Sequence, residues 1–356
     1  MMSMILRCMR LSACMLAVVI MMASCGGDKK KSYDEIGQSG LTVRTENMRD
    51  NLPLISERGV LFGQMSSTLC GAGWQGDSLR SDIKSVCGDN VAVTGYEISD
   101  VTSGTDVSGM SLSAIRSDIL STVQRGSLVI IRWMVPEYLD DEELTDNITS
   151  MSNYLASLQD GYGKRAPVLL YIMPRVHDEW YMSLPADDYK NVYKIIADKL
   201  RELGTSNIVA GYSAEQTINE KETFKAYMPD CELGAVDLSV GDINESENTD
   251  ARWQMLSVQV KALVSVAKSK KCGAGITMGD YCRKDSAYWS QRVLPLIAGN
   301  GLTYALFREN SGMGGDIMAA CPYPGSSDIA DFMHLYNDKR TIFAHNLNGL
   351  YLKKKD

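Results

Sequence analysis

Eight short apolar segments, seven of them followed by a stretch with helical periodicity, dominate this sequence of 356 residues. Segments of this kind, when they alternate with helices, are typical of parallel strands that are covered on both faces. Eight such units predict an α/β fold, a single closed (β/α)8 barrel. The expected strands cover residues 59–64, 91–98, 127–134, 168–172, 207–212, 233–238, 273–278 and 303–307.

Amphipathic segments fill the intervals between the expected strands. The expected helices cover residues 78–86, 111–123, 146–159, 187–203, 253–269, 286–298 and 327–336. The composition is 45% hydrophobic and 22% charged, which is enough for a full core. A net charge of −8 leaves no basic field for nucleic acid, so we expect no nucleic-acid partner. Residues 53–356 are the predicted barrel domain.

The N-terminus has the features of an export signal. Arg7 and Arg10 precede the apolar run 11–22, which is too short to span a membrane. Small residues then lead to Cys25 in an arrangement similar to a bacterial lipobox. We therefore predict a signal peptide over residues 1–24, lipidation of Cys25, and a leader and linker over residues 25–52. An ordinary signal peptide with a chance cysteine is the alternative. The prediction is an exported bacterial lipoprotein anchored to a membrane, and the sequence does not indicate the leaflet.

Six cysteines remain in the predicted mature chain: Cys70, Cys87, Cys231, Cys272, Cys282 and Cys321. Cys282 and Cys321 fall in loops expected at one face of the barrel, so they are the best candidates for a disulfide. Buried thiols are the expectation for most of the six. The spacing of cysteines and histidines fits no metal site, and no cofactor-binding motif is present, so we expect neither a metal nor a cofactor.

Polar residues crowd together where the fourth expected strand ends. The apolar run 168–172 is followed by Arg175, His177, Asp178, Glu179 and Trp180. Active sites of α/β barrels lie at the C-terminal ends of the strands. An imidazole, two carboxylates and an indole at that position predict a site that handles sugars, and a solvated loop is the alternative.

Several aromatic residues also fall at or just beyond the C-terminal ends of expected strands. They include Trp74, Trp133, Trp180, Tyr181 and Phe307. Aromatic faces stack on the apolar faces of sugar rings, so these residues are candidates for binding substrate. The alternative is that several of them pack the loops together.

Motifs near both ends of the predicted barrel resemble glycoside hydrolase family 26, whose best-known members are endo-β-1,4-mannanases. They are Leu61-Phe-Gly-Gln64 and Gly73-Trp74 at the start, and Cys321-Pro-Tyr-Pro-Gly325 with Asp331-Phe332 at the end. The resemblance runs from about Leu61 to Tyr351 and implies a (β/α)8 barrel. It also implies retaining hydrolysis by two glutamates roughly 5 Å apart, an acid/base after the fourth strand and a nucleophile after the seventh.

The chain departs from the family at both catalytic positions. His177 matches the histidine of the acid/base motif, but Asp178 stands at the glutamate and Glu179 comes one place late. The nucleophile motif, Thr-Glu-x-Gly, corresponds to residues 276–279, where we expect Met278 at the nucleophile position. A thioether carries no negative charge, so Met278 is not expected to be catalytic.

Other positions implied by the resemblance have changed as well. Trp133-Met134 replaces a Trp-His pair, Asp237-Leu-Ser239 replaces an Asp-x-Tyr motif, and Phe307 before Arg308 replaces a tryptophan. The substrate-binding candidates are therefore His177, Trp74, Trp133, Trp180, Tyr181, Asp237, Phe307 and Arg308.

Three hypotheses about function follow. The first is a surface lipoprotein that binds β-mannan or a related β-glycan with weak or no hydrolysis. The second is an active β-glycanase with rearranged carboxylates, for example Glu179 as acid with Asp280 or Glu309 as base. The third is a structural lipoprotein that contacts other proteins. We expect the partners to be a polysaccharide and a membrane, and the chain to be a monomer.

Overall fold

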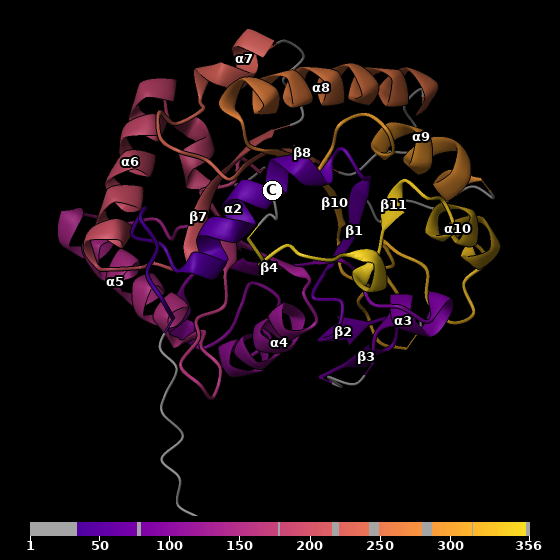
Figure 1. The fold of residues 1–356 in the computed structure, drawn as a ribbon, viewed down its shortest axis with the longest axis horizontal. Coiled ribbons are helices and arrows are strands. Elements are labelled where there is room, and N and C mark those ends of the chain that lie inside the picture. Colours follow the sequence, from indigo (N-terminus) through magenta and orange to yellow (C-terminus); the bar gives the residue numbers. More distant parts are fainter. Residues whose placement is uncertain are drawn as a thin grey trace, which may run out of the picture. The chain divides into compact units, whose positions relative to one another are not determined.

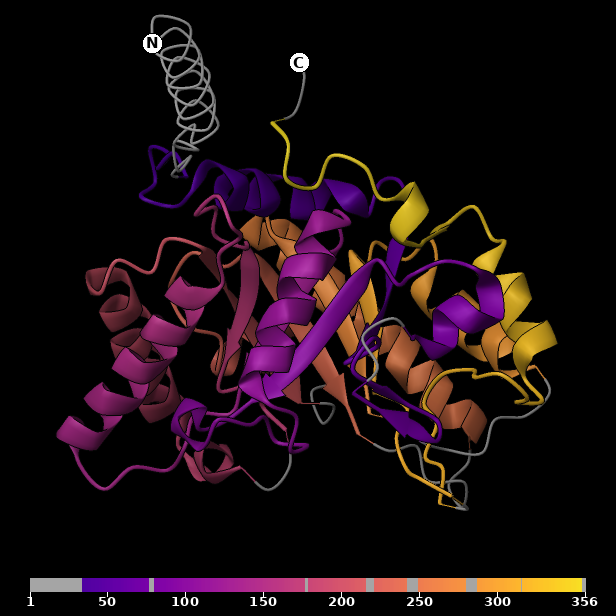
Figure 2. The ribbon, with the colours of Figure 1, turned by 90° about the horizontal axis from the view of Figure 1, so that it is seen from below.

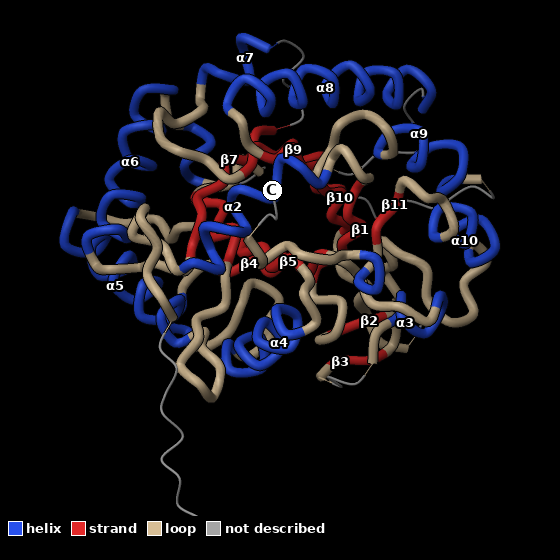
Figure 3. The backbone as a smooth tube through the Cα atoms, viewed as in Figure 1, coloured by secondary structure: helices blue, strands red, loops and turns tan. Residues whose placement is uncertain are grey.

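Eight parallel strands close into a barrel, as the sequence predicts (Figures 1 and 3). The computed structural model describes residues 34–76, 80–176, 179–215, 221–241, 249–279, 287–314 and 316–353. The barrel strands are β1 (Val60–Met65), β4 (Val93–Ile98), β5 (Leu128–Trp133), β6 (Val168–Ile172), β7 (Ile208–Glu215), β8 (Ala235–Val240), β9 (Gly273–Met278) and β10 (Tyr304–Phe307). Each strand pairs with the next, and β10 pairs with β1 through Leu61 opposite Tyr304, which closes the ring.

Helices surround the barrel (Figure 3). They are α3 (Asp82–Cys87), α4 (Leu112–Gln124), α5 (Asp141–Ser157), α6 (Ala186–Glu202), α7 (Lys221–Ala226), α8 (Thr249–Lys270), α9 (Leu294–Ile297) and α10 (Ile329–Tyr336). In α6 the buried residues Tyr189, Tyr193, Ile196 and Leu200 recur at helical spacing, which turns one face to the barrel. The helix expected over 286–298 begins with a π-helical segment, η3 (Tyr288–Val293), before α9. No helix of the described ranges combines the length and apolar character needed to cross a bilayer.

A helix that the sequence did not predict closes the N-terminal end of the barrel (Figure 2). This helix, α2 (Val43–Ile55), buries Met48 and Leu52 completely. The hydroxyl of Thr303, just before β10, donates to the carbonyl of Leu52 at 3.2 Å. Part of the stretch predicted as a linker up to residue 52 therefore belongs to the barrel, and the compact unit that contains the barrel starts at Asp34. Residues 1–33, with the predicted signal peptide and Cys25, lie outside the described part of the chain.

The C-terminal tail packs at the same end. Its strand β11 (Thr341–Ile342) pairs with β1, and the hydroxyl of Tyr351 donates to the carbonyl of Ser127, just before β5, at 2.6 Å. Asn47 of α2 donates to the carbonyl of Tyr351 at 3.1 Å. Helix α2 and the C-terminal tail thus cover one end of the barrel together and leave the other end to the strand-to-helix loops.

Two tyrosines fill the middle of the barrel. Tyr171 and Tyr304 are fully buried, and their hydroxyl groups are 2.5 Å apart. A Cβ added to Gly275 would lie 2.0 Å from Cζ of Tyr304, and one added to Gly211 would lie 2.6 Å from Cε1 of Tyr171. Glycine on the neighbouring strands therefore makes the space in which each ring lies.

The fit between these glycines and the tyrosine rings predicts that even a methyl side chain at Gly275 destabilises the protein. Gly275→Ala should lower the free energy of unfolding by about 1–3 kcal/mol, because the added methyl overlaps a ring that has no room to move. Gly161→Ala is the control, since nothing lies within 4 Å of the added Cβ there. Urea denaturation of the two variants and the wild type measures the difference. Equal stability of all three proteins would contradict this account of the core.

Helix α2 provides a second test. Leu52→Ala should lower the free energy of unfolding by about 2–5 kcal/mol if α2 is part of the barrel core. Asp50→Ala, on the exposed side of the same helix, should change it by less than about 1 kcal/mol. If residues up to 52 were a linker, both substitutions would have the same negligible effect on urea denaturation.

Candidate functional site: the C-terminal mouth of the barrel

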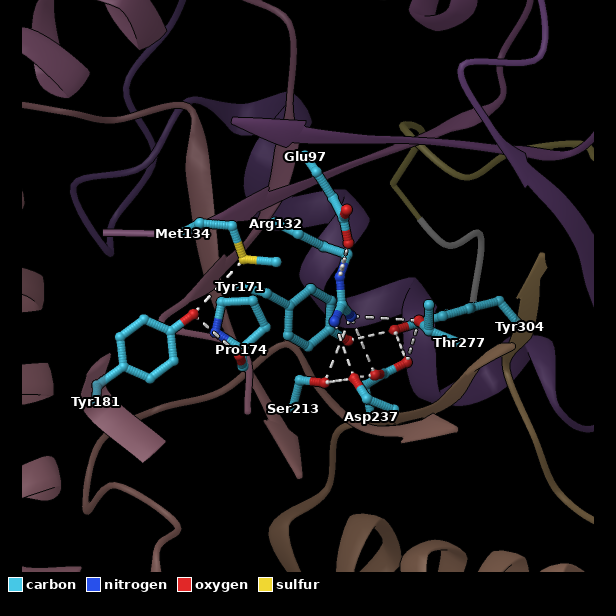
Figure 4. Close-up of polar contacts among 11 residues, drawn as sticks. Glu97, Arg132, Met134, Tyr171, Pro174, Tyr181, Ser213, Asp237, Thr277 and Tyr304 are labelled. Atoms are coloured by element: carbon cyan, nitrogen blue, oxygen red, sulfur yellow. Dashed lines mark hydrogen bonds and ion pairs between the residues drawn. The ribbon is translucent and has the colours of Figure 1, made fainter. Parts of the chain in front are cut away.

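A buried arginine spans the barrel interior near the C-terminal ends of the strands. Arg132 of β5 is 1% exposed, and its Nε lies 3.2 Å from the carboxylate of Glu97 on β4. On the other side, Nη1 approaches Asp237 of β8 at 3.4 Å, and Nη2 donates to the hydroxyl of Ser239 at 2.9 Å. The same Nη1 is 3.4 Å from the hydroxyl of Thr277 on β9. Figure 4 shows this guanidinium at the centre of the cluster, which we call the Arg132 network.

Asp237 is the buried counterion of the Arg132 network. It has no exposed surface, and it accepts hydrogen bonds from Ser213 at 2.6 Å, from Thr277 at 2.9 Å and from Tyr304 at 2.9 Å. Because the single proton of the Tyr304 hydroxyl goes to Asp237, Tyr304 accepts from Tyr171. Together with the ion pair to Arg132, these hydrogen bonds compensate for the removal of the carboxylate from water.

The network fixes the protonation states of its members. Burial alone would lower the pKa of Arg132, but the carboxylates of Asp237 and Glu97 raise it above its ordinary value. Burial, followed by the negative charge of Asp237, raises the pKa of Tyr304 and of Tyr171 well above the usual range. Both phenols are therefore neutral hydrogen-bond donors at pH 7.

Above the Arg132 network lies a cleft of about 560 Å³. Its lining includes charged residues from five strand ends and the loops that follow: Glu97, Arg132, Arg175, Glu179, Glu215, Arg308 and Glu309. Glu179 and Arg308 were predicted as site residues, and the structure places both in this lining. Glu309, which the sequence offered as a possible base, lies there too.

Arg175 is the second buried arginine of the cleft. The residue two places before it, Met173, adopts the left-handed conformation with φ 47°, which turns the chain sharply as it leaves β6. The guanidinium of Arg175 then lies over the ring of Tyr227, 3.7 Å from its centroid, and Nη2 is 3.6 Å from the carboxylate of Glu215.

The strand register places Thr277, rather than Met278, at the mouth. Successive side chains of a strand point to opposite faces, and Thr277 points inward to Asp237. Met278 therefore points toward the helices; it is 1% exposed and belongs to the hydrophobic core, whereas Thr277 and Gly279 line the cleft. The expectation that Met278 takes the nucleophile position at the mouth is corrected by one residue.

Asp237 was predicted to bind substrate, but the structure buries it below the cleft as the partner of Arg132. The aromatic candidates are also engaged elsewhere, and no aromatic residue appears among the described residues that line the cleft. Phe307 stacks on Phe62 outside the barrel, with ring centroids 5.2 Å apart. Trp133, which is 1% exposed, donates to the carbonyl of Ser99 at 3.2 Å.

Three further aromatic candidates hold loops in place. Trp74, in the hairpin of β2 (Cys70–Gly71) and β3 (Trp74–Gln75), donates to Asp82 at 2.8 Å. Half-buried Trp180 donates to the carbonyl of Val135 at 2.8 Å, and buried Tyr181 donates to the carbonyl of Pro174 at 3.1 Å. These contacts favour the alternative that the aromatic residues pack the loops.

Some predicted residues cannot be placed. His177, Asp178, Asp280 and Cys282 lie outside the described residues, so the acid/base position and the predicted pair of Cys282 with Cys321 stay predictions. Cys70, Cys87, Cys231 and Cys272 are free thiols. Burial raises the pKa of Cys70 to about 12 and that of the other three to about 11, which favours the neutral thiol over the nucleophilic thiolate.

The site residues that the sequence did not single out are Arg132, Ser213 and Thr277. Each lies within an apolar strand segment, where it interrupts the run close to the strand's C-terminal end. A polar residue in a continuous apolar strand must be paired inside the barrel. A polar residue that interrupts an apolar strand segment was therefore the feature of the sequence that could have identified these three site residues.

Comparison with solved structures gives the fold a name. A family 26 β-mannanase from Bacteroides ovatus matches with a TM-score of 0.81 at 22% identity, over 88% of this chain and 99% of its own. The fold is that of the family 26 β-mannanases. A modular endo-β-1,4-mannanase from Cellulomonas fimi matches with a TM-score of 0.78 at 17% identity, over 91% of this chain and 80% of its own. A family 26 protein from Muricauda sp. matches with a TM-score of 0.76 at 15% identity, over 91% and 97%. No protein-family model and no curated protein matches the chain.

The Arg132 network makes a prediction about stability. Arg132→Met should lower the free energy of unfolding by about 3–5 kcal/mol, because it leaves the charge of Asp237 buried without a cation. Arg132→Met combined with Asp237→Asn should recover part of this loss, since neither charge remains. Urea denaturation at pH 7 measures both. The single variant Asp237→Asn completes the comparison. If the two single substitutions lower the free energy of unfolding by amounts that simply add in the double variant, the two residues are not coupled.

Proposed function

We propose that this protein binds a β-1,4-linked glycan of the mannan type in the cleft at the mouth of the barrel and does not cleave it by the retaining mechanism. The fold shared with family 26 β-mannanases supports a carbohydrate ligand. The position of the cleft supports its assignment as the binding site, because (β/α)8 barrels carry their active sites at the C-terminal ends of the strands. The observation that carries the proposal is Thr277, which faces the cleft from the seventh barrel strand.

A retaining glycosidase needs a carboxylate at that place to attack the sugar. The hydroxyl of Thr277 donates to Asp237 and lies beside the guanidinium of Arg132. No base is available to remove the proton of this hydroxyl group. The carboxylate that accepts its hydrogen bond, Asp237, is already occupied by Ser213, Tyr304 and Arg132. Glu97 and Asp237 are the nearest carboxylates of the network, and both are paired with Arg132. The charges at the floor of the cleft therefore balance one another, and neither carboxylate is left unpaired to act as a nucleophile.

Hydrolysis by rearranged carboxylates is the second candidate function. It is favoured by one observation, the presence of Glu179 and Glu309 in the same cleft lining. Two carboxyl groups in one cleft suit an inverting mechanism, in which one activates water while the other protonates the leaving oxygen.

The N-terminal sequence supports a further part of the proposal, an exported lipoprotein anchored at Cys25 that acts as a monomer. Incorporation of labelled palmitate into the full chain, and its loss in Cys25→Ala, measures the anchor. Sedimentation of the mature chain without its lipid measures the oligomeric state, and a dimer would contradict the monomer.

Binding and hydrolysis are separated by two measurements on the mature protein. Titration calorimetry with mannohexaose should give a saturable binding isotherm, while assays of reducing ends with mannan, glucomannan and mixed-linkage β-glucan should stay at the background. Reducing ends released with inversion of the anomeric centre would replace the proposal by the second candidate function. No binding of any of these glycans would reject both candidates.

The corrected register gives a sharper test by gain of function. Thr277→Glu puts a carboxylate at the cleft, so it should raise mannan hydrolysis above that of the wild type by about tenfold or more. The gain will be limited, because the new carboxylate also pairs with the guanidinium of Arg132. Met278→Glu, one residue along, should give no activity and should destabilise the protein, because its charge would enter the apolar layer behind the strand. Activity in Met278→Glu alone would show that the register argument is wrong.

A further inference from the structure

Two buried guanidinium groups line the cleft, and they differ in how they are satisfied. Arg132 has carboxylate and hydroxyl partners on all three of its nitrogens. Arg175 is 3% exposed, yet no acceptor among the described residues lies within hydrogen-bond distance of its Nε or Nη1. Its third nitrogen, Nη2, is 3.6 Å from the carboxylate of Glu215, which is an ion pair but too long for a hydrogen bond.

Tyrosine rings hold the guanidinium of Arg175 in place. It lies 3.7 Å from the ring centroid of Tyr227 and 5.4 Å from that of Tyr189. The nearby hydroxyl of Tyr212 is also buried and has no hydrogen-bond partner in the described part of the chain. Stacking on rings balances part of the charge but uses none of the N–H groups.

A buried guanidinium with unused N–H groups is costly. An unsatisfied buried donor loses its hydration without replacement, and the loss is greater for a charged group. Arg132 shows that the same fold can satisfy a buried arginine completely. The unused donors of Arg175, which also lines the cleft, therefore point to an acceptor that a ligand supplies.

We propose that Arg175 receives the carboxylate of an acidic sugar, so that the preferred ligand is a β-1,4-linked glycan that carries uronate residues. This inference rests on the proposed function, because it assigns a ligand class to the same cleft. A planar guanidinium binds a carboxylate through two parallel N–H groups, and both of its forks include Nη2. A ligand carboxylate that takes the place of the distant carboxylate of Glu215 contacts Nη2 first. It reaches Nε or Nη1 as the second contact when the guanidinium turns toward the cleft, because both of these atoms are covered in their present position.

Glu215 has a defined part in this proposal. Its carboxylate competes with the ligand for Nη2 and repels a second negative charge. The carboxylates of Glu97 and Asp237 interfere less, because Arg132 already balances them. Removing the charge of Glu215 should therefore strengthen the binding of an acidic ligand, whereas removing Arg175 should weaken it.

The experiment compares two tetrasaccharides that share one backbone. Mannotetraose is the neutral β-1,4-linked ligand, and the tetrasaccharide of β-1,4-linked mannuronate carries a carboxylate on each ring. Titration calorimetry at pH 7 with the mature wild-type protein should show tighter binding of the mannuronate ligand. In Arg175→Met the affinity for mannuronate should fall by about tenfold or more, while that for mannotetraose stays within about twofold. In Glu215→Gln the mannuronate ligand should bind severalfold more tightly.

Two controls separate recognition from charge and from folding. Arg175→Lys keeps the positive charge without the planar fork, so it should recover only a small part of the preference. Arg58→Met removes a charge from the opposite end of the barrel, beside the C-terminal tail, and should leave both affinities unchanged. Thermal unfolding of each variant shows whether its fold is retained, and the unchanged affinity for mannotetraose in Arg175→Met serves the same purpose.

The outcomes distinguish this inference from the function on which it rests. If the wild type binds mannotetraose as tightly as mannuronate, or if Arg175→Met weakens both equally, the acidic ligand is rejected and glycan binding stands. If neither tetrasaccharide binds, the proposed function fails and this inference fails with it. A mannuronate preference that Arg175→Met removes and Glu215→Gln enhances establishes the assignment.

Discussion

The ion pair between Arg132 and Asp237 is the interaction on which the mouth of the barrel depends. It joins β5 to β8 across the interior, and the hydroxyl groups that complete it come from β7, β8, β9 and β10. Two charges taken out of water are stable only if the remaining donors and acceptors are also satisfied. Each of these strands must therefore present one particular side chain inward, which fixes its register against its neighbours.

The same pair limits what chemistry the mouth can do. In a glycosidase the carboxylates of the site stabilise a positive charge that develops on the sugar. Here a permanent positive charge from Arg132 already lies between Glu97 and Asp237. The floor of the cleft is therefore electrostatically complete before any ligand arrives. In the function we propose, recognition falls to the groups above it, such as Arg175, whose Nε and Nη1 have no hydrogen-bond partner among the described residues.

The barrel was predictable because its strands are continuous apolar runs separated by amphipathic helices. Helix α2 was not, because it has weak amphipathic character and contains Pro53. Only its contacts with the barrel, such as that of Leu52 with Thr303, make it part of the core.

The site was partly predictable: Glu179 and Arg308 line the cleft, as their places after strands suggested. Laid over residues 276–279, the glutamate of the Thr-Glu-x-Gly motif falls on Thr277 rather than on Met278, and in the structure it is Thr277 that faces the cleft. None of the aromatic candidates is among the described residues that line the cleft, because position after a strand does not say whether a ring faces the cleft or the helices.

The placement of α2 determines which end of the barrel is open to a large ligand. The first described residue, Asp34, accepts a hydrogen bond from the backbone of Arg165 on the approach to β6, at the end of the barrel that α2 covers. The cleft lies at the opposite end of the strands. A long polymer could therefore lie across the mouth without meeting α2 or the C-terminal tail.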